Sequence, residues 1–149
     1  MGMAKSMATA MAVLLVLGFA MAKVQAEGAK QAKGPDLEHL MESMEKAKRA
    51  IARDVKEKNI TESTLKAIAD MQRDTLAAKD AVPEAIAKLT GEAKTKALAS
   101  YRGMMNNIVR QLLDLEDVLG EKKYAEAEEI LNAIKEIEKQ GHKEFRQEH

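Results

Sequence analysis

The sequence predicts an all-α fold, an up-down-up-down antiparallel four-helix bundle that follows an N-terminal signal peptide. Two observations indicate helices. The chain has only two prolines among 149 residues and is rich in Ala, Glu, Lys, Leu and Met, and after residue 36 its apolar residues recur every three or four positions. Amphipathic helices joined by short connections favour antiparallel neighbours around one core. The predicted parts are a signal peptide at residues 1–26, a flexible lead-in at 27–35 and the bundle at 36–149.

Residues 1–26 have the parts of a secretory signal. Lys5 gives a positive start, residues 7–22 are uncharged, and Val24 to Ala26 offer small residues for cleavage, with residues 20–22 as a second candidate site. An uncleaved membrane anchor is the alternative, but the uncharged stretch is shorter than the ~20 residues that a spanning helix needs. We therefore expect export to the bacterial periplasm or to the outside.

The mature chain is nearly neutral and has no cysteine. Removing residues 1–26 takes away Lys5 and Lys23, which leaves 22 basic against 24 acidic side chains and a formal charge of −2. That charge argues against nucleic acid as a partner, and no segment after residue 26 is apolar enough for stable membrane insertion. The absence of cysteine excludes disulfides, thiolate metal sites and covalent cofactor attachment through a C-x-x-C-H motif.

The first two helices each start at a capping residue. Asp36 is the expected cap of the first helix, which ends in the polar run 56–59 and has the apolar stripe Leu37, Leu40, Met41, Met44, Ala47, Ile51 and Val55. Thr61 is the expected cap of the second helix, whose predicted buried side is Leu65, Ile68, Met71, Thr75 and Leu76. Pro83 ends or turns this helix because proline lacks the backbone donor. Residues 82–91 then form a longer connection with a short helical turn.

The last two helices are predicted as antiparallel neighbours because only residues 121–123 join them. The third runs from about Glu92 to Leu119, with Gly120 as a C-terminal stop, and its apolar positions are Leu98, Tyr101, Met105, Ile108, Leu112, Leu115 and Leu119. The fourth begins near Tyr124, and its apolar positions are Ala127, Ile130, Leu131, Ile134, Ile137, Gly141 and Phe145.

Met41 and His142 are the two residues that offer distinctive chemistry. In the predicted bundle the start of the first helix and the end of the last lie at the same end, so a thioether and an imidazole would face each other across one pocket. Such a pair can hold a haem iron from both sides. Taken singly, Met41 is typical of a flexible core filler and His142 of a histidine at the core edge.

A haem slot also needs apolar walls and a cation near the carboxylates at the haem edge. The expected wall residues flank Met41 or add bulk on the middle helices: Leu37, Met44, Met71, Tyr101 and Met105. Arg146, one turn after His142, is the candidate cation, and a solvated C-terminal arginine is the alternative reading.

From Asp36 to Arg146 the chain resembles the soluble cytochrome b-562 family. The opening Asp36-Leu37-Glu38-x-x-Met41-Glu42 and the closing His142-x-x-Phe145-Arg146 look like the family's two ligand-bearing motifs. Other positions with similar spacing are Met71, Leu76, Pro83, Tyr101-Arg102 and the segment 123–127. The resemblance implies one non-covalent haem b, with one iron per chain held by Met41 and His142.

Three positions depart from the resembled pattern. Glu138, one turn before His142, stands where the resembled protein has an arginine, and it would disfavour a haem propionate or instead orient the imidazole. Gly141 and Met105 each replace an aromatic residue, so a wall is reduced. None of these changes removes a donor.

The leading hypothesis is a periplasmic electron-transfer protein, and not an enzyme, because two protein ligands would fill both axial positions of the iron. Periplasmic redox proteins are the expected partners, and the protein is expected to be a monomer. The alternative is a haem-free helical bundle that serves as a periplasmic binding or structural module. A dinuclear carboxylate site is disfavoured because no histidine follows Glu at the Glu-x-x-His spacing, and His39 is expected to face solvent.

Overall fold

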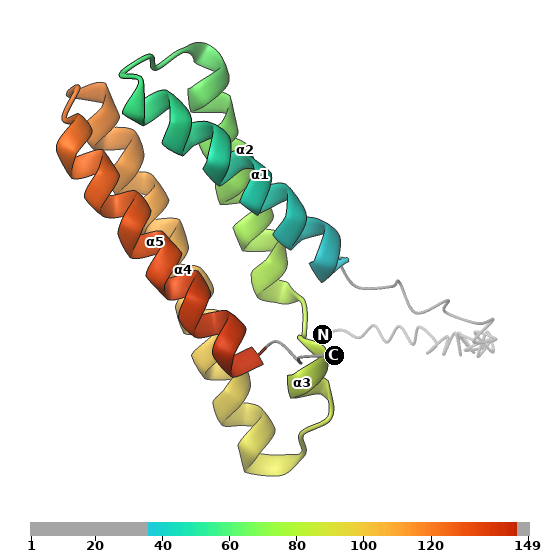
Figure 1. The fold of residues 1–149 in the computed structure, drawn as a ribbon. Helices are drawn as coiled ribbons and strands as arrows, with labels where there is room; N and C mark the ends of the chain where they lie inside the picture. The colour runs from blue at the N-terminus through green and yellow to red at the C-terminus, as the bar shows by residue number, and fades with distance from the viewer. Residues whose placement is uncertain (1–35, 146–149) are drawn as a thin grey trace, which may run out of the picture. The chain divides into compact units, whose positions relative to one another are not determined.

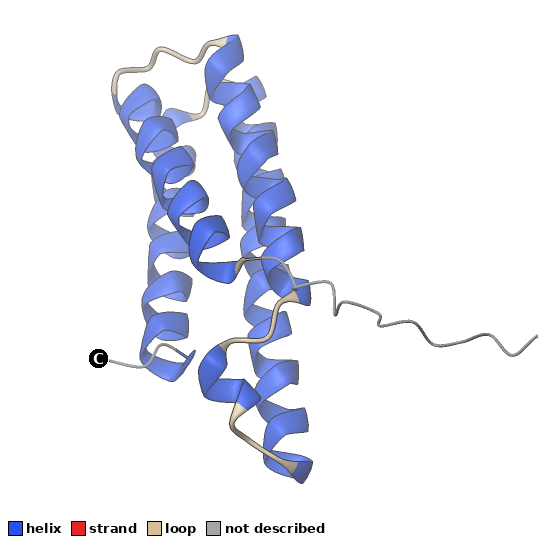
Figure 2. Ribbon diagram, turned by 90° about the vertical axis from the view of Figure 1, so that its right-hand side faces the viewer, coloured by secondary structure: helices blue, strands red, loops and turns tan. Residues whose placement is uncertain are grey.

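The computed structural model describes residues 36–145, which form a four-helix bundle with one additional short helix. The helices are α1 (Leu37–Lys56), α2 (Glu62–Asp80), α3 (Glu84–Ala87), α4 (Gly91–Gly120) and α5 (Tyr124–Phe145). The long helices alternate in direction, and α1 packs against α2 and α5 while α4 packs against the same two helices (Figures 1 and 2). The predicted fold is therefore confirmed. The predicted signal peptide and lead-in lie outside the described residues.

Both predicted caps are present at the helix starts. The Asp36 side chain accepts a hydrogen bond from the backbone N–H of His39 at 3.4 Å, and His39 itself is exposed, as expected. Thr61 and Thr64 form a reciprocal capping box at the start of α2. These bonds satisfy helix donors that have no partner within the helix, so the sequence specifies where α1 and α2 begin.

The end of α4 differs slightly from the prediction, because Gly120 belongs to the helix and does not stop it. Gly120 is the last residue of α4, and the residue with the left-handed conformation is Lys122, with φ 59°. The backbone N–H of Lys122 donates to the carbonyl of Leu119 at 3.0 Å, and that of Lys123 donates to the carbonyl of Val118 at 2.8 Å. These two hydrogen bonds form a Schellman motif. This pattern places the left-handed residue after the helix, so the chain turns at a lysine.

The core consists of apolar residues from all four long helices and from α3. Its fully buried large side chains include Met44, Ile51, Ile68, Met71, Ile86, Tyr101, Ile108, Leu112, Leu115 and Ile134. The prediction that Leu65 and Leu76 face this core is wrong, because they are 46% and 45% exposed. Thr64 and Asp74 are buried instead, since α1 offers both of them polar partners that leucine could not use.

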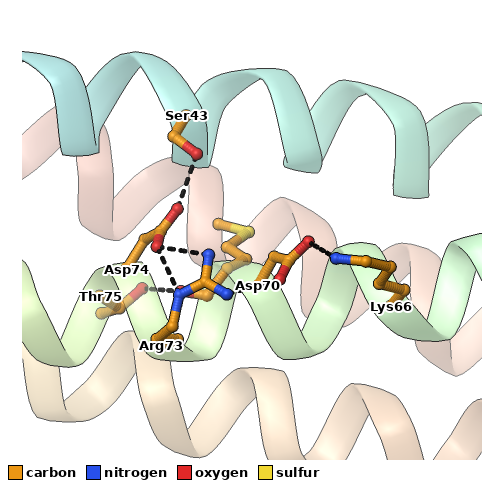
Figure 3. A network of polar contacts seen from close by, with 7 residues as sticks. Ser43, Lys66, Asp70, Arg73, Asp74 and Thr75 are labelled. Atoms are coloured by element: carbon orange, nitrogen blue, oxygen red, sulfur yellow. Dashed lines mark hydrogen bonds and ion pairs between the residues drawn. The ribbon is translucent and has the colours of Figure 1, made fainter.

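Two polar ties fix α1 against α2. The Ser43 hydroxyl on α1 donates to Asp74 on α2 at 2.6 Å, and the neighbouring Arg73 also donates to that carboxylate (Figure 3). Nearer the connecting loop, the Thr64 hydroxyl donates to the buried Asp54 carboxylate at 2.7 Å. Because each hydrogen bond joins a particular residue pair, the two bonds set the register of α1 along α2 and so the position of its first turns along the bundle axis.

Replacing Asp54 with asparagine is expected to lower the free energy of unfolding by about 1.5–3 kcal/mol at neutral pH, the usual contribution of a hydrogen bond to a charged acceptor. Hydrogen bonds from Thr64 and then Arg53 hold the pKa of Asp54 below its usual value of 3.8. This stabilisation is therefore complete above about pH 4 and is lost as the pH falls through the lower folded-state pKa. Urea unfolding at neutral and acidic pH measures it.

The matched control for this prediction is Asp114→Asn, at an exposed position on α4. It should leave the unfolding free energy nearly unchanged at both pH values. A difference between Asp54→Asn and the unaltered chain that stays constant with pH would contradict the assignment of the effect to the Asp54 carboxylate.

Candidate functional site

An ion pair between α1 and α5 shows which faces of these helices meet. Lys48 on α1 is bonded to Glu138 on α5, and the side chains are only 14% and 15% exposed. Met41 precedes Lys48 by two helical turns and His142 follows Glu138 by one, so each lies on the same side of its helix as the paired residue. The side chains of Met41 and His142 therefore belong to the facing sides of α1 and α5.

Met41 and His142 also lie at the same end of the bundle. The first turns of α1 and the last turns of α5 point to one end (Figure 1). With a rise of 1.5 Å per residue, Met41 lies about 10 Å beyond Lys48 and His142 about 6 Å beyond Glu138, both toward that end. The topology thus places both candidate donors at one end of the bundle.

The two donors differ in exposure. Met41 is partly buried and packs against the core. His142 is exposed, and within residues 36–145 no hydrogen bond or ion pair engages its imidazole. A partly buried thioether on α1 and an exposed imidazole on α5 therefore lie at the same end of the bundle, and the imidazole nitrogens are available to a ligand.

The predicted wall residues lie in the core at this interface or beside it. Four of them are buried, with exposed fractions between 0% and 6%: Met44, Met71, Tyr101 and Met105. Leu37 is partly buried and packs against them. The predicted cation, Arg146, lies outside the described residues. The apolar surroundings that a haem requires are therefore present. That each of these residues contacts the haem stays a prediction.

Tyr101 on α4 connects α2, α4 and α5 near the end of the bundle that holds Met41 and His142. Its hydroxyl donates to the backbone carbonyl of Ala78 on α2 at 2.7 Å, and burial raises its pKa to about 12, so the group stays neutral and keeps donating. Its ring meets Phe145 of α5 edge to face, with 5.6 Å between centroids. Ser100 donates to Glu144 at 3.0 Å. These contacts hold the last turn of α5, which carries His142.

Sequence reasoning missed Met104 and Ile86. A Cβ atom at Gly141 would meet the Met104 sulfur at 3.6 Å, an ordinary contact distance, so Met104 covers the position where an aromatic wall is absent. Ile86 of α3 is buried, and α3 packs against α4 and α5. Met104 lies off the main apolar stripe, and α3 has only four residues, so neither gave a periodic signal.

The pairing of Glu138 was also missed. Glu138 and Lys48 are far apart in sequence, and only the packing of α5 on α1 reveals the pair. Lys48 also contacts Glu45 one turn earlier, at 2.5 Å. Burial alone would lower the pKa of Lys48, but bonding to Glu138 and Glu45 outweighs burial and raises it, so the lysine stays charged. The acid at position 138 therefore has a cationic partner.

The donor chemistry at this end suits a haem iron. Among residues 36–145 no three His, Cys, Asp or Glu side chains gather as ligands for a bare metal ion. One thioether and one imidazole on neighbouring helices, with buried apolar side chains beside them, would be a soft and uncharged ligand pair for haem iron. The residues present therefore fit this cofactor.

The bundle also has a shallow hollow of about 430 Å³, at the opposite end from Met41 and His142. It is lined by Lys58, Tyr124, Ala125 and Glu128. None of these side chains is a thioether or an imidazole, and the hollow is open to solvent. It therefore offers no second site for the same chemistry. No helix in the described part of the chain is both long enough and apolar enough to cross a membrane.

Comparison with known proteins gives one finding. A family model described as Cytochrome b562 matches residues 36–146, which is most of the chain and includes every helix described above. Comparisons with curated proteins and with solved structures return no match.

Proposed function

The chain belongs to the cytochrome b562 family, and from this premise we propose that Met41 and His142 are the axial ligands of its haem in a periplasmic electron carrier. The family consists of haem-binding electron-transfer cytochromes with one non-covalent b-type haem and one iron. The proposal adds the identity of the ligands, the compartment and the kind of partner.

The observation that supports the ligand assignment most strongly is the placement of both donors on facing sides of α1 and α5. The Lys48–Glu138 pair defines those sides, and both donors lie beyond it toward the same end of the bundle. Among residues 36–145 the other histidine is His39, which is on α1 together with Met41 and so cannot face it across the α1–α5 interface.

Each residue would have a distinct part in electron transfer. Bound haem supplies a one-electron iron couple, and neutral thioether and imidazole donors favour the ferrous state because neither offsets the extra ferric charge. Met41 would hold one axial position from the core side, and His142 the other from the helix edge. Met44, Met71 and Tyr101 would exclude water from the slot. Two protein donors leave no open position for a substrate, which favours a carrier over an enzyme.

The compartment and partners are proposed from residues 1–26, whose charge, apolar core and small residues form a secretory signal. The protein would exchange single electrons with other periplasmic redox proteins and act as a monomer. Intact mass and cell fractionation test the export. A periplasmic protein that begins after Ala26 or Ala22 supports it, and a full-length chain in the membrane or cytoplasm contradicts it.

Haem titration tests the binding that the proposal requires. Chain lacking residues 1–26 is mixed with increasing haemin and followed by absorption. Saturation at one haem per chain, with the spectrum of a six-coordinate low-spin iron, is the expected result. A chain that stays colourless at excess haemin, while circular dichroism shows its helices intact, contradicts the proposal and supports a haem-free binding or structural module.

A further inference from the structure

Three charged side chains lie together at the α1–α5 interface, one turn inside His142. Lys48 is bonded to Glu138 across the interface and contacts Glu45 on its own helix at 2.5 Å. Both members of the cross-helix pair are at least 85% buried, given exposed fractions of 14% and 15%, whereas Glu45 is 42% exposed. A charge placed there is poorly screened by water.

The Lys48–Glu138 pair lies close to both candidate donors. Glu138 precedes His142 by one turn on the same side of α5, and Lys48 follows Met41 by two turns on the same side of α1. The backbone of Glu138 is about 6 Å from that of His142 along α5, and the backbone of Lys48 about 10 Å from that of Met41 along α1. Because the ammonium and the carboxylate are bonded to each other, removing either charge leaves the other uncompensated within one or two turns of the donors.

We propose that Glu138 and Lys48 are positioning residues that set the reduction potential of the iron, Glu138 lowering it and Lys48 raising it. The inference rests on the proposed ligation by Met41 and His142. Reduction adds one electron to the iron, so a nearby carboxylate disfavours the ferrous state and a nearby ammonium favours it. A second carboxylate, Glu45, also contacts Lys48 and is itself paired with Arg49, so Glu138 depends on Lys48 for compensation of its charge while Glu45 has two cationic partners.

Opposite shifts in two variants test the proposal. Glu138→Gln should raise the midpoint potential of the haem-loaded protein, because it removes the carboxylate charge and keeps the shape. Lys48→Met should lower it, because it leaves the Glu138 carboxylate uncompensated, whereas Glu45 keeps Arg49 as a partner. Potentiometric titration followed by absorption measures both. Matched controls are Glu121→Gln and Lys123→Met, an ion pair of 2.6 Å at the opposite end of the bundle, and neither should shift the potential.

Opposite shifts of the midpoint potential distinguish an electrostatic effect of the two charges from a purely structural effect of the ion pair. A pair that acted only as a mechanical link between α1 and α5 would weaken haem retention in both variants, with no reason for opposite changes in potential. Lys48→Arg and Glu138→Asp keep the charges and should restore the original potential. If Lys48→Met fails to fold, Glu138→Gln and its Asp counterpart still decide the question, because Lys48 keeps Glu45 as a partner in both.

The outcomes separate this inference from the ligand assignment. A low-spin spectrum with unchanged potential in Glu138→Gln overturns the inference and leaves ligation by Met41 and His142 standing. Shifts of the same sign in Glu138→Gln and Lys48→Met also overturn it. An unaltered chain that binds no haem overturns both. Opposite shifts with intact low-spin spectra, and silent controls, support the inference.

Discussion

Replacing His142 with alanine is expected to remove nearly all bound haem. The imidazole would be the stronger of the two donors, and its loss leaves the iron with a single weak thioether. Changes to groups that merely support a metal ligand already reduce affinity about 10- to 100-fold, so loss of the ligand itself should cost at least as much. The measurement is the haem-to-protein ratio after gel filtration, together with the haem dissociation rate.

The helix should tolerate this change, because His142 is exposed and alanine is a strong helix former. His39→Ala is the matched control: His39 is also exposed near the same end of the bundle, and its replacement should leave the haem content unchanged. A His142→Ala protein that keeps a stoichiometric low-spin haem would show that another residue holds this axial position.

Replacing Met41 with leucine is expected to open one axial position while haem remains bound. Leucine keeps most of the volume and lacks the sulfur, so packing against the core should change by less than about 1.5 kcal/mol. With His142 as the only protein donor, the iron should become five-coordinate and high-spin. It should then bind carbon monoxide rapidly in its ferrous state. Absorption spectra with and without carbon monoxide test this.

The control for the methionine is Met44→Leu, on the same helix. Met44 is 2% exposed, whereas Met41 is only partly buried, so Met44 packs in the core and should not reach the iron. Its leucine variant should keep the low-spin spectrum and resist carbon monoxide. If Met44→Leu opens the site and Met41→Leu does not, the thioether ligand has been assigned to the wrong residue.

The fold was largely predictable because local signals and the apolar period agree along the chain. Asp36 and Thr61 cap their helices as predicted, and the apolar stripes of α1, α4 and α5 face the core. The second helix was less well predicted. Its inward positions include Thr64 and Asp74, whose hydrogen bonds to α1 compensate for burial, and a hydrophobicity pattern cannot anticipate such pairing.

The sequence predicted that the two candidate donors lie at one end of the bundle, but it did not predict what surrounds them. Met41 and His142 stand near opposite ends of the mature chain, and antiparallel topology alone brings such positions to one end. The partner of Glu138 and the cover over Gly141 depend on how side chains from different helices meet. In the sequence Lys48 is indistinguishable from a surface lysine. Only the packing of α1 on α5 shows that its side chain is mostly buried.

The most direct test of iron ligation by Met41 is proton NMR of the reduced, haem-loaded protein, with its methionine methyl groups labelled. A methyl group held on the axial sulfur lies over the haem face and is strongly shielded by the ring current. One such upfield methyl signal is expected, absent in Met41→Leu and retained in Met44→Leu. A low-spin protein with no shielded methyl, or one whose signal survives in Met41→Leu, would contradict ligation by Met41.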